Sequence, residues 1–286
     1  MRNSNMKKSA YLIITLSLLI VLGSYSGIAS ASGKIQVAVS VLPQAYFVER
    51  VGGNQVNVQV MIPRGACPEM YEPTPQQLVR LSDSNIYIKV GAPAFPFEEK
   101  YLHVIAGKNK KMTVVNMSDG TRYREQDPHV WVSPSFVKIA ARNIYQALSL
   151  YDPQHRDYYG KNLAAFLSDI EKLDRKIRTL LADKRGYAFL VYHPAWGYFA
   201  DEYGLKQMAI EEEGKIKGAS HIREMIDIAR RKGIKVIFVQ RGFDTKSART
   251  IAHEIGGKVM EVDPLERDWL KGMEAFAEIL PQVLKK

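Results

Sequence analysis

Four side chains that commonly bind transition metals occupy equivalent places in this sequence. Glu69, His129, His193 and Asp263 each come just after a short apolar run that predicts a β-strand, two in each half of the chain. Two imidazoles and two carboxylates form a complete set of ligands for a first-row divalent ion. The sequence therefore predicts one metal site with ligands from both halves.

The apolar runs that precede these residues have the length and composition of buried parallel strands. They are residues 56–62, 112–115, 188–192 and 258–262. In open α/β sheets, ligands bind outside the carboxyl ends of the strands. We therefore expect the metal between two lobes, where these strand ends meet.

The first two candidates lie in loops that restrict their side chains. Prolines are frequent in segment 63–75, so the backbone around Glu69 is constrained. Asp127 precedes His129 by two residues and can accept a hydrogen bond from one ring nitrogen, which leaves the other nitrogen free for a metal. Simpler roles are also open: Glu69 as a solvated surface carboxylate, and His129 as a core histidine with a satisfied ring.

The two later candidates repeat this arrangement. His193 follows a predicted strand, and Pro194 fits the first turn of a helix. Asp263 directly follows the last predicted strand, where a helix N-cap explains an aspartate as well as metal ligation does. Separate structural roles account poorly for a joint location at four strand ends, so the metal site is the leading hypothesis.

Strand-like runs alternate with stretches of helical period, which is typical of parallel sheets wound with helices. The first half contains four predicted strands, at residues 34–41, 56–62, 86–90 and 112–115. The second half contains four more, at residues 188–192, 206–210, 235–239 and 258–262. The predicted fold class is α/β, with two similar four-stranded parallel-sheet lobes.

One long helix is predicted between the lobes, with Asp152 as N-cap, Pro153 at the first position and an end near Lys184. It has one continuous apolar stripe, formed by Leu163, Phe166, Leu167, Ile170, Leu173, Ile177, Leu180 and Leu181. About thirty residues at 1.5 Å each give a rod of about 45 Å. We expect a rigid strut that limits lobe closure to small movements. A coiled-coil dimer arm is the alternative, although the sequence lacks sustained heptad charges.

The first residues have the pattern of a secretory signal. Arg2, Lys7 and Lys8 precede an apolar stretch at 10–22, and Ala-Ser-Ala at 29–31 forms a cleavage site. An uncleaved anchor is the alternative, but this stretch is shorter than the roughly 20 residues that cross a bilayer. The predicted organisation is a signal peptide at 1–31, an N-terminal α/β lobe at 32–152, the linking helix at 153–184 and a C-terminal α/β lobe at 185–286.

After removal of this leader the chain would carry 37 basic and 30 acidic residues, a net charge of +7. These charges are scattered and lack interleaved aromatic residues, so no nucleic acid partner is expected. Cys67 is the only cysteine, which excludes an internal disulfide and also a lipid-bearing cysteine at the leader junction. We expect a monomer in the periplasm or at the cell exterior.

Four stretches resemble those of the periplasmic zinc/manganese-binding proteins of ABC importers, the cluster A-I metal receptors. The stretches are 68–75, 127–134, 193–205 and 259–263, and the likeness covers nearly the whole mature chain. It is specific because Tyr-Glu-Pro-Thr-Pro, Asp-Pro-His-Val-Trp and an aromatic-rich segment after His193 occur in order. The resemblance implies two related α/β lobes joined by a long helix, a metal buried between them and a membrane permease as partner.

The sequence departs from this family at one position. The family usually has its first histidine ligand directly after the proline that corresponds to Pro68, and this chain has Glu69 there. A glutamate can still coordinate a metal, while the Cys67 thiolate or a water are alternatives for the first ligand. The acidic, histidine-rich loop of many zinc-type relatives is also absent between Met117 and Gln126.

These features predict a solute-binding protein that captures one divalent ion, zinc or manganese, and delivers it to the permease of an ABC importer. Monodentate carboxylates would suit zinc and bidentate ones manganese. No enzymatic reaction is expected, because four protein ligands leave no open position on the metal. Two alternatives are an exported metal-dependent hydrolase with Glu69 as general base, and a metal-binding adhesion or interaction protein.

Overall fold

The computed structural model describes residues 33–284, except 125, 213–214, 217 and 242–244. The predicted signal peptide at 1–31 therefore lies outside the described residues. Residues Lys34–Lys286 form one compact unit. Among the helices that are described, none has the length and apolarity needed to cross a membrane.

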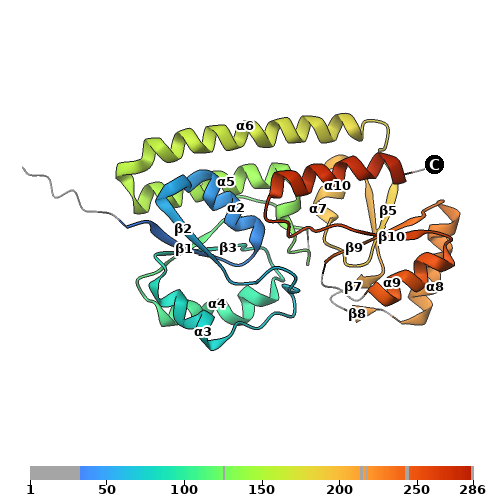
Figure 1. Ribbon diagram of the computed structural model, residues 1–286, viewed down its shortest axis with the longest axis horizontal. Helices are drawn as coiled ribbons and strands as arrows, with labels where there is room; N and C mark the ends of the chain where they lie inside the picture. Colours follow the sequence, from blue (N-terminus) through green and yellow to red (C-terminus); the bar gives the residue numbers. More distant parts are fainter. Residues whose placement is uncertain (1–32, 125, 213–214, 217, 242–244, 285–286) are drawn as a thin grey trace, which may run out of the picture. The chain divides into compact units, whose positions relative to one another are not determined.

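Two four-stranded parallel sheets form the framework of this unit, which confirms the predicted α/β fold class (Figure 1). The first has the order β2-β1-β3-β4, with β1 (Ile35–Val39), β2 (Val56–Val60), β3 (Ile86–Lys89) and β4 (Thr113–Asn116). The second has the order β10-β9-β5-β6, with β5 (Ala188–Val191), β6 (Lys206–Ala209), β9 (Val236–Val239) and β10 (Lys258–Glu261). All eight predicted strands are present, and their ends differ from the prediction by at most two residues.

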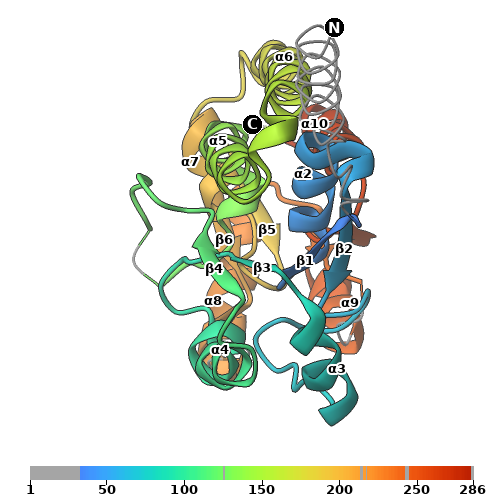
Figure 2. The same cartoon turned by 90° about the vertical axis from the view of Figure 1, so that its left-hand side faces the viewer.

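Each sheet is covered by helices on both faces, as the apolar character of its central strands requires. In the first lobe, α2 (Leu42–Gly52) and α5 (Pro134–Tyr151) cover one face, and α3 (Pro75–Arg80) and α4 (Pro96–Lys108) lie on the other side (Figure 2). In the second lobe, residues of α8 (Ala219–Arg231) and α9 (Thr245–Glu254) pack with Leu190 and Ile237. The opposite face packs against α7 (Gly197–Tyr203) and α10 (Trp269–Val283).

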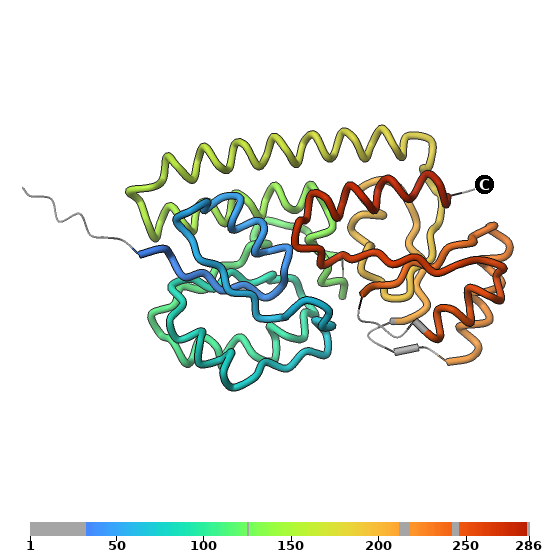
Figure 3. The backbone as a smooth tube through the Cα atoms, in the orientation of Figure 1, coloured from blue at the N-terminus to red at the C-terminus, as the bar shows by residue number. Residues whose placement is uncertain are grey.

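The long helix α6 (Arg156–Leu180) runs beside helices of both lobes (Figure 3). It packs against α5 and α2 from the first lobe and against α10 from the second. Its predicted stripe faces the core. Phe166, Ile170, Leu173 and Ile177 all have at most 6% exposure, Leu181 is also buried, and the other members pack against the core half-buried: Leu163, Leu167 and Leu180.

The helical stretch begins at Pro153 after Asp152, as predicted, whereas its end and the capping role of the Asp152 side chain differ from the prediction. A 3-10 turn, Pro153–His155, precedes α6, and the helix ends at Leu180 rather than near Lys184. Asp152 does not cap with its side chain, because its Oδ2 accepts hydrogen bonds from the Tyr159 hydroxyl at 2.6 Å and from His155 Nδ1 at 2.7 Å. The carboxylate therefore fastens the first turn of α6 to the chain before it.

The larger of the two apolar core clusters among the described residues extends through both lobes, and the smaller one lies in the C-terminal lobe. The Trp269 ring meets Phe47 edge to face, with ring centroids 5.4 Å apart. Trp269 Nε1 donates to the carbonyl of Trp131 at 2.6 Å, and Trp131 Nε1 donates to that of Pro264 at 2.9 Å. These buried contacts join segments more than a hundred residues apart, so they oppose wide separation of the lobes.

Candidate metal centre

The structure brings three of the four predicted ligands together. One donor atom from each of Glu69, His129 and His193 lies within 4.8 Å of the other two. Glu69 belongs to the proline-rich loop after β2, His129 precedes a short 3-10 turn (Val130–Val132), and His193 follows β5. The cluster thus combines residues from both halves of the chain.

The two histidines face each other through their Nε2 atoms, which are 3.1 Å apart. Both side chains are buried, with 5% of His129 and 4% of His193 exposed. Each Nδ1 contacts a carboxylate: His129 Nδ1 lies 2.9 Å from Asp127 Oδ1, and His193 Nδ1 lies 2.6 Å from Glu211 Oε1. A carboxylate accepts hydrogen bonds, so it favours the proton on Nδ1 and a lone pair on Nε2.

Two lone pairs that point at each other repel unless a proton or a cation lies between them. Glu69 places a carboxylate at the same point, with Oε1 3.4 Å from His193 Nε2. Its other oxygen, Oε2, is buried and has no hydrogen-bond partner among the described residues. An unpaired buried carboxylate oxygen is costly. A divalent cation could bind this oxygen and an Nε2 atom from each imidazole at once, so the donor set fits a transition metal.

The structure does not bring Asp263 into this close group. Asp263 is half-buried after β10, and its Oδ1 accepts a hydrogen bond from the amide of Leu265 at 2.9 Å. Burial raises the pKa of this carboxyl group. The alternative role as a helix N-cap is wrong, because α10 begins at Trp269 and its cap is Asp268. Metal ligation by Asp263 stays a prediction.

Cys67, the alternative first ligand, also lies outside the close group of donor atoms. Its side chain is half-buried, and burial raises the pKa of the thiol, which disfavours the thiolate that metals bind. The four other histidines described, His103, His155, His221 and His253, lie outside the group as well. This agrees with their exclusion from the predicted site.

Sequence reasoning missed Glu211. It is buried, immediately follows the run at 206–210 that predicts a strand, and contacts the ring of His193. The same strand-end rule that selected the four candidates would have selected it. The partner of the other ring, Asp127, was expected from its closeness to His129, and the structure confirms that contact.

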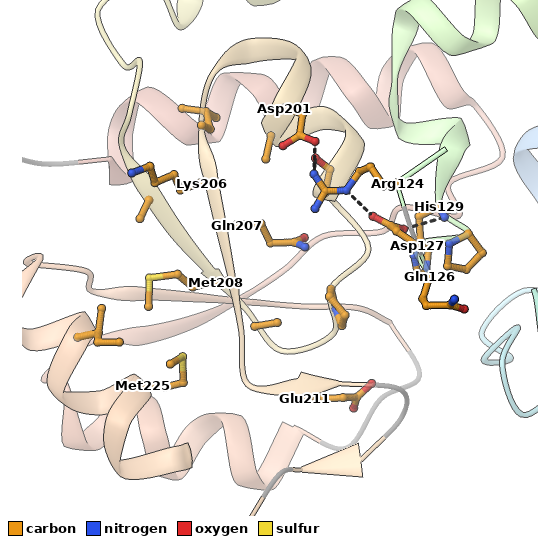
Figure 4. A pocket seen from close by; sticks show the side chains of 18 of the residues that line it. Arg124, Gln126, Asp127, His129, Asp201, Lys206, Gln207, Met208, Glu211 and Met225 are labelled. Atoms are coloured by element: carbon orange, nitrogen blue, oxygen red, sulfur yellow. Dashed lines mark hydrogen bonds and ion pairs between the residues drawn. The ribbon is translucent and has the colours of Figure 1, made fainter. Parts of the chain in front are cut away.

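The site opens into a cavity of about 1180 Å³ (Figure 4). Glu69, His129 and Glu211 line it at the metal cluster. All four residues of the edge strand β6 and several from α8 line the remainder. A hydrated ion could therefore approach the buried histidines along the C-terminal lobe.

Two α/β lobes on a long helix, with imidazoles and a carboxylate converging between them, define a metal-binding solute receptor. Residues 37–283 match the family model described as "Zinc-uptake complex component A periplasmic". This chain belongs to that family. The match covers most of the sequence and agrees with the predicted resemblance.

Known relatives support this assignment. The high-affinity zinc uptake system protein ZnuA of Bacillus subtilis (strain 168) is 26% identical over 263 residues, which cover 85% of this chain and 82% of the relative. A crystal structure of ZnuA is 37% identical with a TM-score of 0.83, covering 87% of this chain and 99% of that one. A zinc-bound 138–173 deletion mutant of ZnuA is 36% identical, also with a TM-score of 0.83, and covers 88% and 99%.

These comparisons confirm the predicted class of protein, a metal receptor of an uptake system rather than an enzyme. They also confirm a divalent transition metal as the bound species of the family. The family is periplasmic, in agreement with the predicted compartment. The hydrolase alternative is wrong for this chain.

Proposed function

We propose that this protein captures one zinc ion outside the cytoplasm and delivers it to the membrane permease of an ABC importer. The observation that carries this proposal is the pair of buried Nε2 atoms 3.1 Å apart, each on a ring held by a carboxylate. The histidines cannot form this arrangement comfortably without a cation or a proton between them. The name of the family and the zinc-bound relative support zinc as the ion.

Glu69, His129 and His193 are the proposed protein ligands already assembled, and Asp263 is the proposed fourth. Asp263 follows β10, which runs parallel to β9 and β5, so its carboxylate lies at the same edge of the sheet as His193. Its approach on metal binding would complete a tetrahedral set of two nitrogens and two oxygens. Manganese would instead require bidentate carboxylates and about six donors.

We further propose that the signal peptide directs export of the protein and is cleaved after Ala31. The mature chain then acts as a monomer without a nucleic acid partner, with lobes at 32–152 and 185–286 and a linking helix at 153–184. The shared core around Trp131 and Trp269 supports a rigid receptor in which small shifts release the metal. The permease would provide the contact that triggers such a shift.

Metal analysis and thermal melts of the purified mature chain test this function. We expect one equivalent of zinc and a rise in melting midpoint with zinc, because a ligand that binds only the folded state stabilises it. His129→Ala and His193→Ala should each abolish both effects. His103→Ala is the matched control, since His103 is exposed on α4 and should leave both unchanged. Unaltered zinc content in both site variants would refute the proposal.

A further inference from the structure

His129 is held by a set of contacts that extends beyond its own loop. Asp127 Oδ1 accepts from the His129 ring and from the His129 amide, each at 2.9 Å. The other oxygen, Oδ2, lies 3.4 Å from Arg124 Nε. Only 15% of the Asp127 side chain is exposed, so this carboxylate benefits from a nearby positive charge.

Arg124 in turn reaches across to the C-terminal lobe (Figure 4). Its Nη1 forms an ion pair with Asp201 and donates to the carbonyl of Gly197 at 3.3 Å, both on α7. The amide of Arg124 donates to the Tyr198 hydroxyl at 2.8 Å, and that hydroxyl donates to the carbonyl of Asp127 at 3.2 Å. Three residues of α7, namely Gly197, Tyr198 and Asp201, therefore hold this loop at Arg124 and at Asp127.

The packing at this contact leaves no space for an additional atom. A Cβ on Gly197 would collide with Asp127 Oδ2 and crowd Arg124 Nε. Gly197 follows His193 by four residues, so the contact joins the segment after one histidine to the segment before the other. The distance between the imidazole rings of His129 and His193 therefore depends on how the loop before His129 packs against the start of α7.

We propose that Arg124 is a positioning residue that sets His129 for metal binding by bracing Asp127 against α7 of the C-terminal lobe. It does not touch the metal. Its guanidinium links Asp201 to Asp127, which orients the imidazole and keeps its Nε2 directed at His193. This inference rests on the proposed function, because its effect appears only when a metal binds.

The first test is the rate of zinc release from the mature protein into excess chelator. Loss of an outer partner of a metal-bound histidine typically weakens binding by about 10- to 100-fold. We expect Arg124→Ala to release zinc about tenfold faster, at the lower end of this range. Asp201→Asn should act in the same direction, and it is the cleaner variant because Asp201 is exposed and touches neither histidine.

A matched control is available in Arg267, which joins the lobes through an ion pair with Glu49 at 2.5 Å and, among the described residues, pairs with none of the site. Arg267→Ala should leave the rate unchanged within about twofold. If Arg124→Ala and Asp201→Asn behave like Arg267→Ala, the proposal is wrong. A wild-type protein that binds no zinc would instead refute the proposed function itself.

A double-variant cycle tests whether Arg124 acts through Asp127. Arg124→Ala combined with Asp127→Asn should release zinc no faster than Asp127→Asn alone. Effects that multiply would show an independent role and overturn the proposal. The visible spectrum of the cobalt-loaded protein gives a second readout, because it reports ligand geometry. Arg124→Ala should shift this spectrum, and a lower melting midpoint with an unshifted spectrum would reduce Arg124 to a structural role.

Discussion

The two histidines of the metal centre are supported in different ways. His193 is held within its own lobe, because Glu211 follows β6, His193 follows β5, and these two strands pair with each other. His129 is held by Asp127 from the same loop, and that loop is braced against α7 of the other lobe. One imidazole is thus fixed by a sheet and the other by a contact between lobes. Movement of the lobes would disturb His129 first.

The largest expected effect is the loss of either imidazole. Both rings contribute a nitrogen at the same point, so His129→Ala and His193→Ala should weaken zinc binding by more than the roughly 100-fold that outer partners account for. Isothermal titration or chelator competition measures this. Retention of near-normal affinity by one variant would show that the two histidines do not share a metal.

The next effect concerns the first ligand. Glu69→Ala removes a carboxylate whose Oε2 is buried without a hydrogen-bond partner, so it should weaken zinc binding strongly. Cys67→Ser in the same loop is the matched comparison, and it should change the zinc affinity by less than about twofold. Burial raises the pKa of the Cys67 thiol, and its sulfur lies outside the close group of donor atoms. A larger loss from Cys67→Ser than from Glu69→Ala would assign the first ligand to sulfur.

A third prediction sharpens the contrast between the two supports. Glu211→Gln and Asp127→Asn each replace the carboxylate that orients a ring, and each should weaken zinc binding by about 10- to 100-fold. Glu211→Gln should have the larger effect, because its contact is shorter at 2.6 Å and its side chain is only 6% exposed, against 2.9 Å and 15% for Asp127. Asp83→Asn, on an exposed turn, provides the control. A larger loss of zinc affinity in Asp127→Asn than in Glu211→Gln would contradict the claim that His193 is held more rigidly than His129.

The smallest effect is a pH-dependent change in stability at Asp263. Burial raises its folded pKa, so the protonated form is favoured on folding. The contribution of this carboxyl group to the free energy of unfolding is fully present below its pKa in the unfolded chain. It is lost as the pH rises through its pKa in the folded protein. Metal-free Asp263→Asn should therefore be slightly more stable than the wild type at neutral pH, and the two should converge in acid. Urea melts at several pH values measure the difference, and a less stable variant at neutral pH would contradict it.

Much of the fold could be predicted because its signals are local. Buried parallel strands read as short β-branched runs, and the stripe from Phe166 to Ile177 recurs at helical spacing. The capping role of the Asp152 side chain could not be predicted in the same way. Its carboxylate accepts hydrogen bonds from the side chains of Tyr159 and His155 and not from the backbone amides of the first helical turn. The short antiparallel pair β7 (Glu211–Glu212) and β8 (Lys215–Ile216) was not predicted, because two-residue strands have no periodicity to detect.

The metal centre shows the same division between local and distant information. Asp127 could be paired with His129 from a separation of two residues, whereas Glu211 lies eighteen residues beyond His193 and is brought near by the pairing of β5 with β6. The bracing of Arg124 by α7 depends on how two lobes pack, which no spacing in the sequence encodes. Asp263 shows that a position at a strand end is not sufficient to identify a member of the close donor group, because the structure leaves its carboxylate outside that group.

X-ray absorption at the zinc edge of the loaded mature protein tests the central claim most directly. Ligation by His129, His193 and carboxylates predicts a first shell of nitrogen and oxygen atoms at about 2.0–2.2 Å from the zinc. It also predicts scattering from the outer ring atoms of two imidazoles. The signal of the imidazoles should fall by half in His129→Ala if residual zinc remains bound. A sulfur contribution at about 2.3 Å, or a shell without imidazole signals, would contradict the proposed site.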